Sequence, residues 1–251
     1  MTFTTNLNQY LDSMVTPNPS ITPVQIISCM DLTLLNEHAN SNSFDEMNIL
    51  AQKHKVAAVC VFIDRLSHFR NLSKVTGIAT VINFPSGLDT VERCLDEIDR
   101  ALHLGVTEID YVLPYQHYLE GDINYSLNHC KAIAKSCSEN RLKLKFILET
   151  GAFNNIETVY ELSSKLIDMG ADFIKTSTGK IDQGASPSSA FAILSAIRDS
   201  NTNCGIKISG GIKTPYQALQ YASLAEHFSG KAIDKSWFRI GASSLLRELL
   251  K

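Results

Sequence analysis

The chain lacks the patterns that mark several common classes of protein. Its 23 Lys and Arg residues stand against 26 Asp and Glu residues, a net charge of -3 that does not indicate a nucleic-acid or anionic-membrane partner. No apolar run approaches the roughly 18 residues of a membrane-spanning helix, and residues 1–13 lack the charged and then apolar order of a signal peptide. We therefore expect a soluble cytoplasmic protein that holds any anion by local geometry.

Metal-site and dinucleotide-site patterns are also missing. The 6 cysteines contain no C-x-x-C pair, and none of the 7 histidines lies three or four positions from another. We expect the cysteines to be free thiols that fill the core. We also expect no metal or cofactor, although a metal site built from ligands distant in sequence stays an alternative. The chain contains neither G-x-G-x-x-G after its first apolar run nor G-x-x-x-x-G-K-[ST] anywhere.

Short apolar or alternating runs predict eight strands. They are Gln25–Met30, Val56–Phe62, Ile78–Ile82, Glu108–Val112, Leu142–Leu148, Asp172–Ile174, Gly205–Ile208 and Phe238–Ile240. Helical spacing separates them, as in residues 91–102 and 156–169, and glycines at positions 105 and 170 suit left-handed ends for these two helices.

Strands that alternate with helices predict parallel pairing through crossover connections. Eight such units in 251 residues match an α/β fold of the TIM (β/α)8 barrel type. The alternative is an open doubly wound sheet, which the missing dinucleotide and P-loop motifs disfavour. We expect an N-terminal lead-in over residues 1–24 and a single catalytic barrel domain over residues 25–251.

Ionisable residues occur at the expected ends of several strands. Asp110 follows Gly105 by five positions, and Lys175 follows Gly170 by five. Asp31 and Lys207 occupy comparable strand positions. Because the carboxyl ends of barrel strands line one pocket, these four side chains could converge there. Any single one of them could instead be a solvated strand end or a turn residue.

Two lysines at neighbouring strand ends would change each other's chemistry. Each ammonium would lower the pKa of the other, and a neutral lysine amine is a nucleophile that forms a Schiff base with a carbonyl. The protonated Schiff base accepts electrons when a neighbouring carbon–carbon bond breaks, which is aldolase chemistry without a metal. Asp110 is suited to the proton transfer that this chemistry needs.

Three segments after the last strands are suited to phosphate. They are Thr176–Lys180, Ser209–Lys213 and Gly241–Ser244, and the last leads into a helix. Glycines let backbone N–H groups approach an anion, and barrels commonly hold phosphate after strands seven and eight. For the loop after strand seven or the loop after strand eight taken alone, the alternative is an ordinary tight turn with a serine cap.

Seven blocks in order make the chain resemble the deoxyribose-phosphate aldolases. The blocks are Cys29–Thr33, Ala57–Cys60, Ile78–Pro85, Glu108–Asp110, Lys145–Gly151, Gly170–Lys180 and Lys207–Thr214, and the likeness continues to Gly241–Leu246. The resemblance implies a TIM barrel that reversibly cleaves 2-deoxy-D-ribose 5-phosphate to acetaldehyde and D-glyceraldehyde 3-phosphate, in deoxyribose breakdown. It implies phosphorylated sugars and aldehydes as ligands, no cofactor, and a homodimer as one possible assembly.

The resemblance also assigns roles by position in these motifs. Lys175 matches the Schiff-base lysine, and Asp110 with Lys207 matches the proton-relay pair that works through a water. The positions that match sugar contacts are Asp31, Thr33, Cys60 and Thr178. The positions that match phosphate contacts are Lys180, Gly210, Gly211, Gly241, Ser243 and Ser244.

Three departures from the family pattern change our expectations. Lys213 stands where many relatives carry arginine, so phosphate affinity could be lower. The segment from Val61 to Gly77 is short, so the second helix should be clipped. The chain ends at Leu249–Lys251 without the tyrosine tail of some members, so turnover could be slower or another group could substitute. A phosphate-binding barrel isomerase and a non-catalytic sugar-phosphate-binding barrel remain as alternatives.

Overall fold

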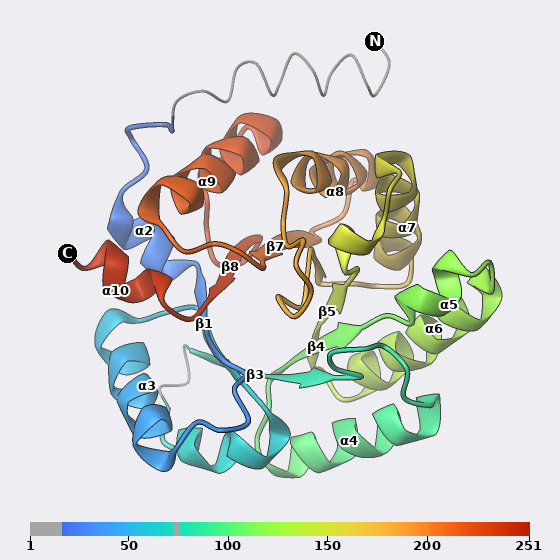
Figure 1. The fold of residues 1–251 in the computed structure, drawn as a ribbon, viewed down its shortest axis with the longest axis horizontal. Helices are drawn as coiled ribbons and strands as arrows, with labels where there is room; N and C mark the ends of the chain where they lie inside the picture. Colours follow the sequence, from blue (N-terminus) through green and yellow to red (C-terminus); the bar gives the residue numbers. More distant parts are fainter. Residues whose placement is uncertain (1–16, 73–75) are drawn as a thin grey trace.

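Eight parallel strands close a barrel in the order of the sequence, as the alternating pattern predicts (Figure 1). The computed structural model describes residues 17–72 and 76–251. The strands are β1 (Met30–Leu34), β2 (Ala58–Val61), β3 (Gly77–Ile82), β4 (Glu108–Val112), β5 (Lys143–Ile147), β6 (Phe173–Lys175), β7 (Gly205–Ser209) and β8 (Phe238–Ala242). Pairing of β1 with β8 completes the ring.

Helices surround the barrel and connect successive strands (Figure 1). They are α2 (Pro23–Ser28), α3 (Ser41–His54), α4 (Val91–His103), α5 (Tyr115–Leu119), α6 (Ile123–Glu139), α7 (Ile156–Asp168), α8 (Pro187–Ser200), α9 (Pro215–Ser229) and α10 (Leu245–Leu249), with 3-10 turns η1 (Ile63–Phe69) and η2 (Thr150–Ala152). In the described part of the chain, none of them has the length and apolar character needed to cross a membrane.

The helix ends follow local sequence signals. Thr90 caps α4 by accepting a hydrogen bond from the Arg93 amide, which satisfies one of the free N–H groups of the first turn. Gly105 and Gly170 follow the ends of α4 and α7 with φ of 85° and 96°, a left-handed conformation in which glycine carries no Cβ penalty. Both predicted helices are therefore confirmed.

The first predicted strand, Gln25–Met30, is wrong. Residues 23–28 form α2, and the strand begins only at Met30. Thr22 accepts from the Gln25 amide while the Gln25 side chain accepts from the Thr22 amide, and Pro23 stands in the first turn. This capping box with an N-terminal proline is a helix-start signal. A short apolar run such as Ile26–Ile27 fits a buried helix as well as a strand.

Two further expectations concern the chain before and after these elements. Residues 1–16 of the predicted lead-in lie outside the described residues, and residues 17–22 contain no helix or strand. Asn18 attaches this segment to α9, because its amide donates to Ser223 Oγ at 2.7 Å. Between β2 and β3, the described residues form a single element, the 3-10 turn η1. This agrees with the expectation that the second helix is clipped.

The inside of the barrel is charged at its centre. On β4, Ile109 and Tyr111 face outward, and the Tyr111 hydroxyl reaches His129 of α6 at 3.4 Å. Side chains alternate across a strand, so Glu108 and Asp110 face inward. Barrel interiors are usually filled by layers of branched apolar residues. Fully buried carboxylates there therefore call for matching cations.

Candidate active site

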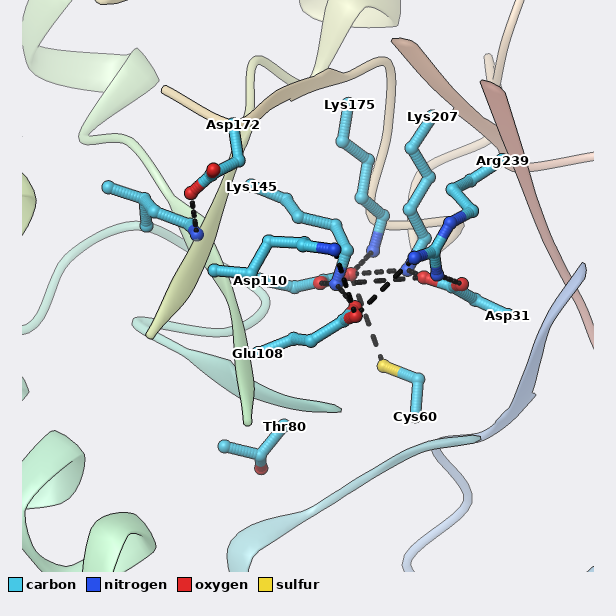
Figure 2. Close-up of polar contacts among 12 residues, drawn as sticks. Asp31, Cys60, Thr80, Glu108, Asp110, Lys145, Asp172, Lys175, Lys207 and Arg239 are labelled. Atoms are coloured by element: carbon cyan, nitrogen blue, oxygen red, sulfur yellow. Dashed lines mark hydrogen bonds and ion pairs between the residues drawn. The ribbon is translucent and has the colours of Figure 1, made fainter. Parts of the chain in front are cut away.

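The four ionisable residues singled out at strand ends converge inside the barrel (Figure 2). Asp110 Oδ2 lies 2.8 Å from Lys175 Nζ and 2.6 Å from Lys207 Nζ, and Lys207 Nζ lies 2.5 Å from Asp31 Oδ2. Lys175 and Lys207 are direct partners in the register of β6 and β7. All four side chains are buried, with Lys175 the most exposed at 3%. The solvated alternative is thereby excluded for each.

Three further residues complete the buried cluster, and the sequence reasoning assigned none of them to the site. Lys145 Nζ contacts Asp110 Oδ1 at 2.8 Å and Glu108 Oε2 at 2.5 Å. Arg239 Nη1 contacts Asp31 Oδ1 at 2.6 Å. The available sequence signal was a charged residue within an otherwise apolar strand, as in Lys145-Phe-Ile.

Opposite charges keep Asp110 ionised. Burial alone would raise the pKa of this carboxyl, but the ammonium groups of Lys145, Lys175 and Lys207 hold it well below its usual range. Burial would also raise the pKa of Asp31, but the charges of Lys207 and Arg239 hold it low. The site therefore contains carboxylates that accept protons only when their cations are displaced or neutralised.

The pKa values of the buried lysines are shifted in opposite directions. Burial and the neighbouring Lys207 lower the pKa of Lys175, although Asp110 opposes this. For Lys207, the attraction of Asp110 and Asp31 overcomes burial and raises the pKa. The pKa of Lys145 is also raised, because the attraction of Asp110, Glu108 and Asp31 overcomes burial. Lys175 is therefore the lysine of the cluster that most readily becomes a neutral amine, as its position predicts for a nucleophile.

Of the positions predicted to contact the sugar, Asp31 belongs to the buried cluster and Cys60 lies beside it. Cys60 Sγ is 4.0 Å from Asp110 Oδ2, and burial raises the pKa of its thiol to about 11, which keeps it protonated. Thr33 is half-buried, and its hydroxyl donates to the Asp31 carbonyl at 2.8 Å. Cys60 also packs in a small apolar cluster with Ala79 and Val81 of β3.

Thr178 is fixed by a buried carboxylate that the sequence reasoning did not single out. Its hydroxyl donates a short hydrogen bond to Glu149 Oε2, and its amide donates to Glu149 Oε1 at 3.3 Å. Glu149 follows β5 with a left-handed φ of 56°, uncommon for a residue with a side chain. Burial raises the pKa of this carboxyl, against the Thr178 hydrogen bonds. The loop after β6 is thus anchored to the end of β5.

Three of the positions predicted to contact phosphate, Gly210, Gly211 and Gly241, lie at the ends of β7 and β8. Gly210 and Gly211 have φ of 86° and 90°, and a Cβ at Gly210 would lie 3.1 Å from Ser177 Cβ. A Cβ at Gly241 would lie 3.0 Å from Lys207 Cε. The glycines therefore allow the three loops to approach one another and leave room for the lysine.

The other positions predicted to contact phosphate, Lys180, Ser243 and Ser244, follow β6 and β8. Ser243 and Ser244 precede α10 and line a pocket of about 300 Å³ that Thr33 also lines. Lys180 is exposed, and its ammonium donates to the Leu35 carbonyl at 2.8 Å, across the barrel mouth from its own strand. Lys213 is exposed too, with its amide bonded to Gln217. In the described ranges, no group of three or more His, Cys, Asp or Glu side chains could hold a metal ion.

Known structures share this architecture. The tetrameric deoxyribose phosphate aldolase of Aeropyrum pernix has a TM-score of 0.77 at 24% identity, covering 100% of this chain and 97% of that one. A candidate deoxyribose-phosphate aldolase from Coccidioides immitis has a TM-score of 0.80 at 23% identity over 98% of both chains. The aldolase QR15 has a TM-score of 0.76 at 25% identity over 90% of this chain and 96% of that one.

The family assignment comes from the sequence model of the DeoC/LacD family aldolases, which matches residues 25–251. The match covers every strand of the barrel and the whole buried cluster. It agrees with the lysines and carboxylates at the strand ends. The chain therefore belongs to the DeoC/LacD family of aldolases.

Proposed function

We propose that the protein is a class I aldolase that reversibly cleaves 2-deoxy-D-ribose 5-phosphate to acetaldehyde and D-glyceraldehyde 3-phosphate. The observation that carries the proposal is the state of Lys175. Its amine is buried 2.8 Å from Asp110, next to a second ammonium, and burial lowers its pKa. A lysine in this setting has the free amine that Schiff-base formation requires.

Cleavage would begin at the C1 aldehyde of the sugar. The neutral Lys175 amine adds to C1, and loss of water with uptake of one proton gives a protonated Schiff base. A base then removes the proton of the C3 hydroxyl, the C2–C3 bond breaks, and its electron pair moves to the iminium nitrogen. Glyceraldehyde 3-phosphate leaves, and an enamine stays on the enzyme. Protonation of the enamine at C2 and hydrolysis release acetaldehyde and regenerate the amine.

Asp110 and Lys207 are the proposed proton relay. They contact each other directly at 2.6 Å beside the Lys175 amine, so a water bound against this pair would have a donor and an acceptor with which to carry a proton to or from the reacting carbons. Lys207 has a second role, because its charge disfavours the ammonium form of Lys175.

Phosphate recognition is the part of the proposal that fixes the substrate class. Gly210, Gly211 and Gly241 allow backbone amides to face an anion, and Ser243 with Ser244 adds hydroxyls. A 5-phosphate held at these loops would direct C1 of the sugar towards β6. The exposed Lys180 would add charge once its bond to the Leu35 carbonyl is exchanged for phosphate.

Trapping with borohydride tests the proposal directly. Reduction in the presence of acetaldehyde should add one ethyl group to Lys175, found by peptide mass mapping, and Lys175→Met should abolish both adduct and cleavage. Lys131→Met, on the exposed face of α6, is the matched control and should behave as wild type. Sugar-phosphate isomerisation that survives Lys175→Met with only a weakened KM would favour a phosphate-binding barrel isomerase whose lysines act electrostatically. Calorimetric binding without product would favour a non-catalytic sugar-phosphate binder.

A further inference from the structure

The buried cluster has one more cation than carboxylates. Its members are Asp31, Glu108, Asp110, Lys145, Lys175, Lys207 and Arg239, and none has a side chain more than 5% exposed. With every group ionised the cluster would carry a net charge of +1. Removing one proton from one lysine makes it neutral. A low-dielectric interior favours that neutral state, because an uncompensated buried charge is costly.

The contacts show which lysine is least compensated. Lys145 contacts three carboxylates, at 2.5, 2.8 and 3.6 Å, and Lys207 contacts two, at 2.5 and 2.6 Å. Arg239 also contacts two, at 2.6 and 3.4 Å. Among the described residues Lys175 contacts a single carboxylate, Asp110, and shares it with the other two lysines. The excess proton is therefore held most weakly at Lys175.

Glu108 and Arg239 set this balance from the floor of the barrel, where neither reaches the reacting lysine. Glu108 begins β4, and its carboxylate lies in space that Gly77 leaves open, since a Cβ there would stand 2.5 Å from Glu108 Oε1. Arg239 bridges Glu108 and Asp31 and lies 5.3 Å from the centre of the Phe173 ring. The floor of the barrel thus holds one buried anion, Glu108, in contact with one buried cation, Arg239.

We propose that Glu108 and Arg239 are positioning residues that fix the charge balance of the buried cluster and thereby make Lys175, and not Lys145 or Lys207, the nucleophilic amine. The inference rests on the proposed Schiff-base function. The two residues act through the chain of contacts from Glu108 to Lys145, to Asp110 and then to Lys175. Arg239 acts through Asp31 and Lys207.

Opposite changes of charge give opposite effects on the reaction. Glu108→Gln removes an anion, so the cluster disfavours the Lys175 ammonium more strongly and its pKa falls. Arg239→Gln removes a cation, so the ammonium is favoured and the pKa rises. For buried charges two contacts apart we expect shifts of about one pH unit in each direction. A residue with only a packing role would lower activity without this opposition of sign.

Other titratable groups face Lys175 from the surrounding strands. They are Asp31 on β1, Cys60 on β2, Asp110 on β4, Lys145 and Glu149 on or after β5, and Lys207 on β7. Lys143 also contacts Glu108, at 3.7 Å, but its side chain is 34% exposed. These groups are the same in both variants, so the difference between the variants isolates the floor charges.

The test is the pH dependence of acetaldehyde adduct formation, trapped by borohydride and mapped by mass spectrometry. The acid limb should move down by about one pH unit in Glu108→Gln and up by about one in Arg239→Gln. Arg239→Lys keeps the charge and should stay near the wild-type limb. Lys143→Gln is the matched control, because solvent screens the cation it removes.

The outcomes distinguish a failure of the charge-balance inference from a failure of the proposed Schiff-base function. Shifts in the same direction, or no shift in Glu108→Gln, overturn the inference even when Lys175 carries the adduct. If Arg239→Gln does not fold, the shift in Glu108→Gln and its absence in Arg239→Lys decide. An adduct on a lysine other than Lys175 in the wild type overturns the proposed function instead, before any variant is measured.

Discussion

Replacing Asp110 by asparagine should destabilise the fold in a strongly pH-dependent way. The change removes the carboxylate that three lysines share, at 2.6 to 2.8 Å, in a fully buried site. A second lysine would then lose its proton on folding, because an unpaired buried ammonium costs more. Keeping a lysine neutral at pH 7 costs about 4 to 5 kcal/mol, since its pKa in the unfolded chain is about 10.4.

The sign of the pH dependence follows from that proton. Below about pH 10 the unfolded chain of Asp110→Asn binds two more protons than its folded state, whereas in the wild type the difference is one, so raising the pH stabilises the variant relative to wild type. The gain is about 1.4 kcal/mol per pH unit. The deficit of about 4 to 5 kcal/mol at pH 7 should therefore shrink to about 2 kcal/mol at pH 9.

Urea unfolding at both pH values measures the two deficits. Asp96→Asn, on the exposed face of α4, is the matched control and should stay within about 0.5 kcal/mol of wild type. A deficit below about 1 kcal/mol at pH 7 would show that Asp110 carries no essential charge in the cluster. A large deficit that does not narrow at pH 9 would refute the proton-linked explanation.

Three further predictions use other parts of the site and fold. Gly241→Ala should lower kcat by at least tenfold, because its Cβ would lie 3.0 Å from Lys207 Cε; steady-state kinetics with the sugar phosphate tests it. Thr22→Ala should lower the free energy of unfolding by about 1 kcal/mol through loss of the α2 cap, without changing kcat. Cleavage should slow as pH falls, because protonation removes the Lys175 nucleophile; a flat profile from about pH 5 to 8 would contradict an activated amine.

Much of the fold could be predicted from the sequence because local signals repeat along the chain. Gly105 and Gly170 end helices at the expected places, and seven of the eight predicted strands overlap observed ones by more than one residue, whereas the first shares only Met30 with β1. The first strand was misplaced because Ile26 and Ile27 suit a buried helix equally well, and only the Thr22 cap distinguishes the two.

The candidate site could be predicted in part. Asp110 and Lys175 stood out by their equal distance from a glycine, and both lie in the cluster. Glu108, Lys145 and Arg239 were missed as site residues because a single charged residue in a strand does not reveal which side of the strand it occupies. Inward orientation depends on strand register, and the register is set by the whole closed sheet.

The sequence by itself determined the alternation of strands and helices, the glycine-rich ends of the last three strands and the presence of lysines at two of them. Those features depend on short-range periodicity and on backbone preferences of single residues. Only the tertiary structure decided that Lys175 has one carboxylate partner while Lys207 has two. That difference arises because barrel closure brings β1, β4 and β7 together, and distance and burial decide which amine keeps its proton.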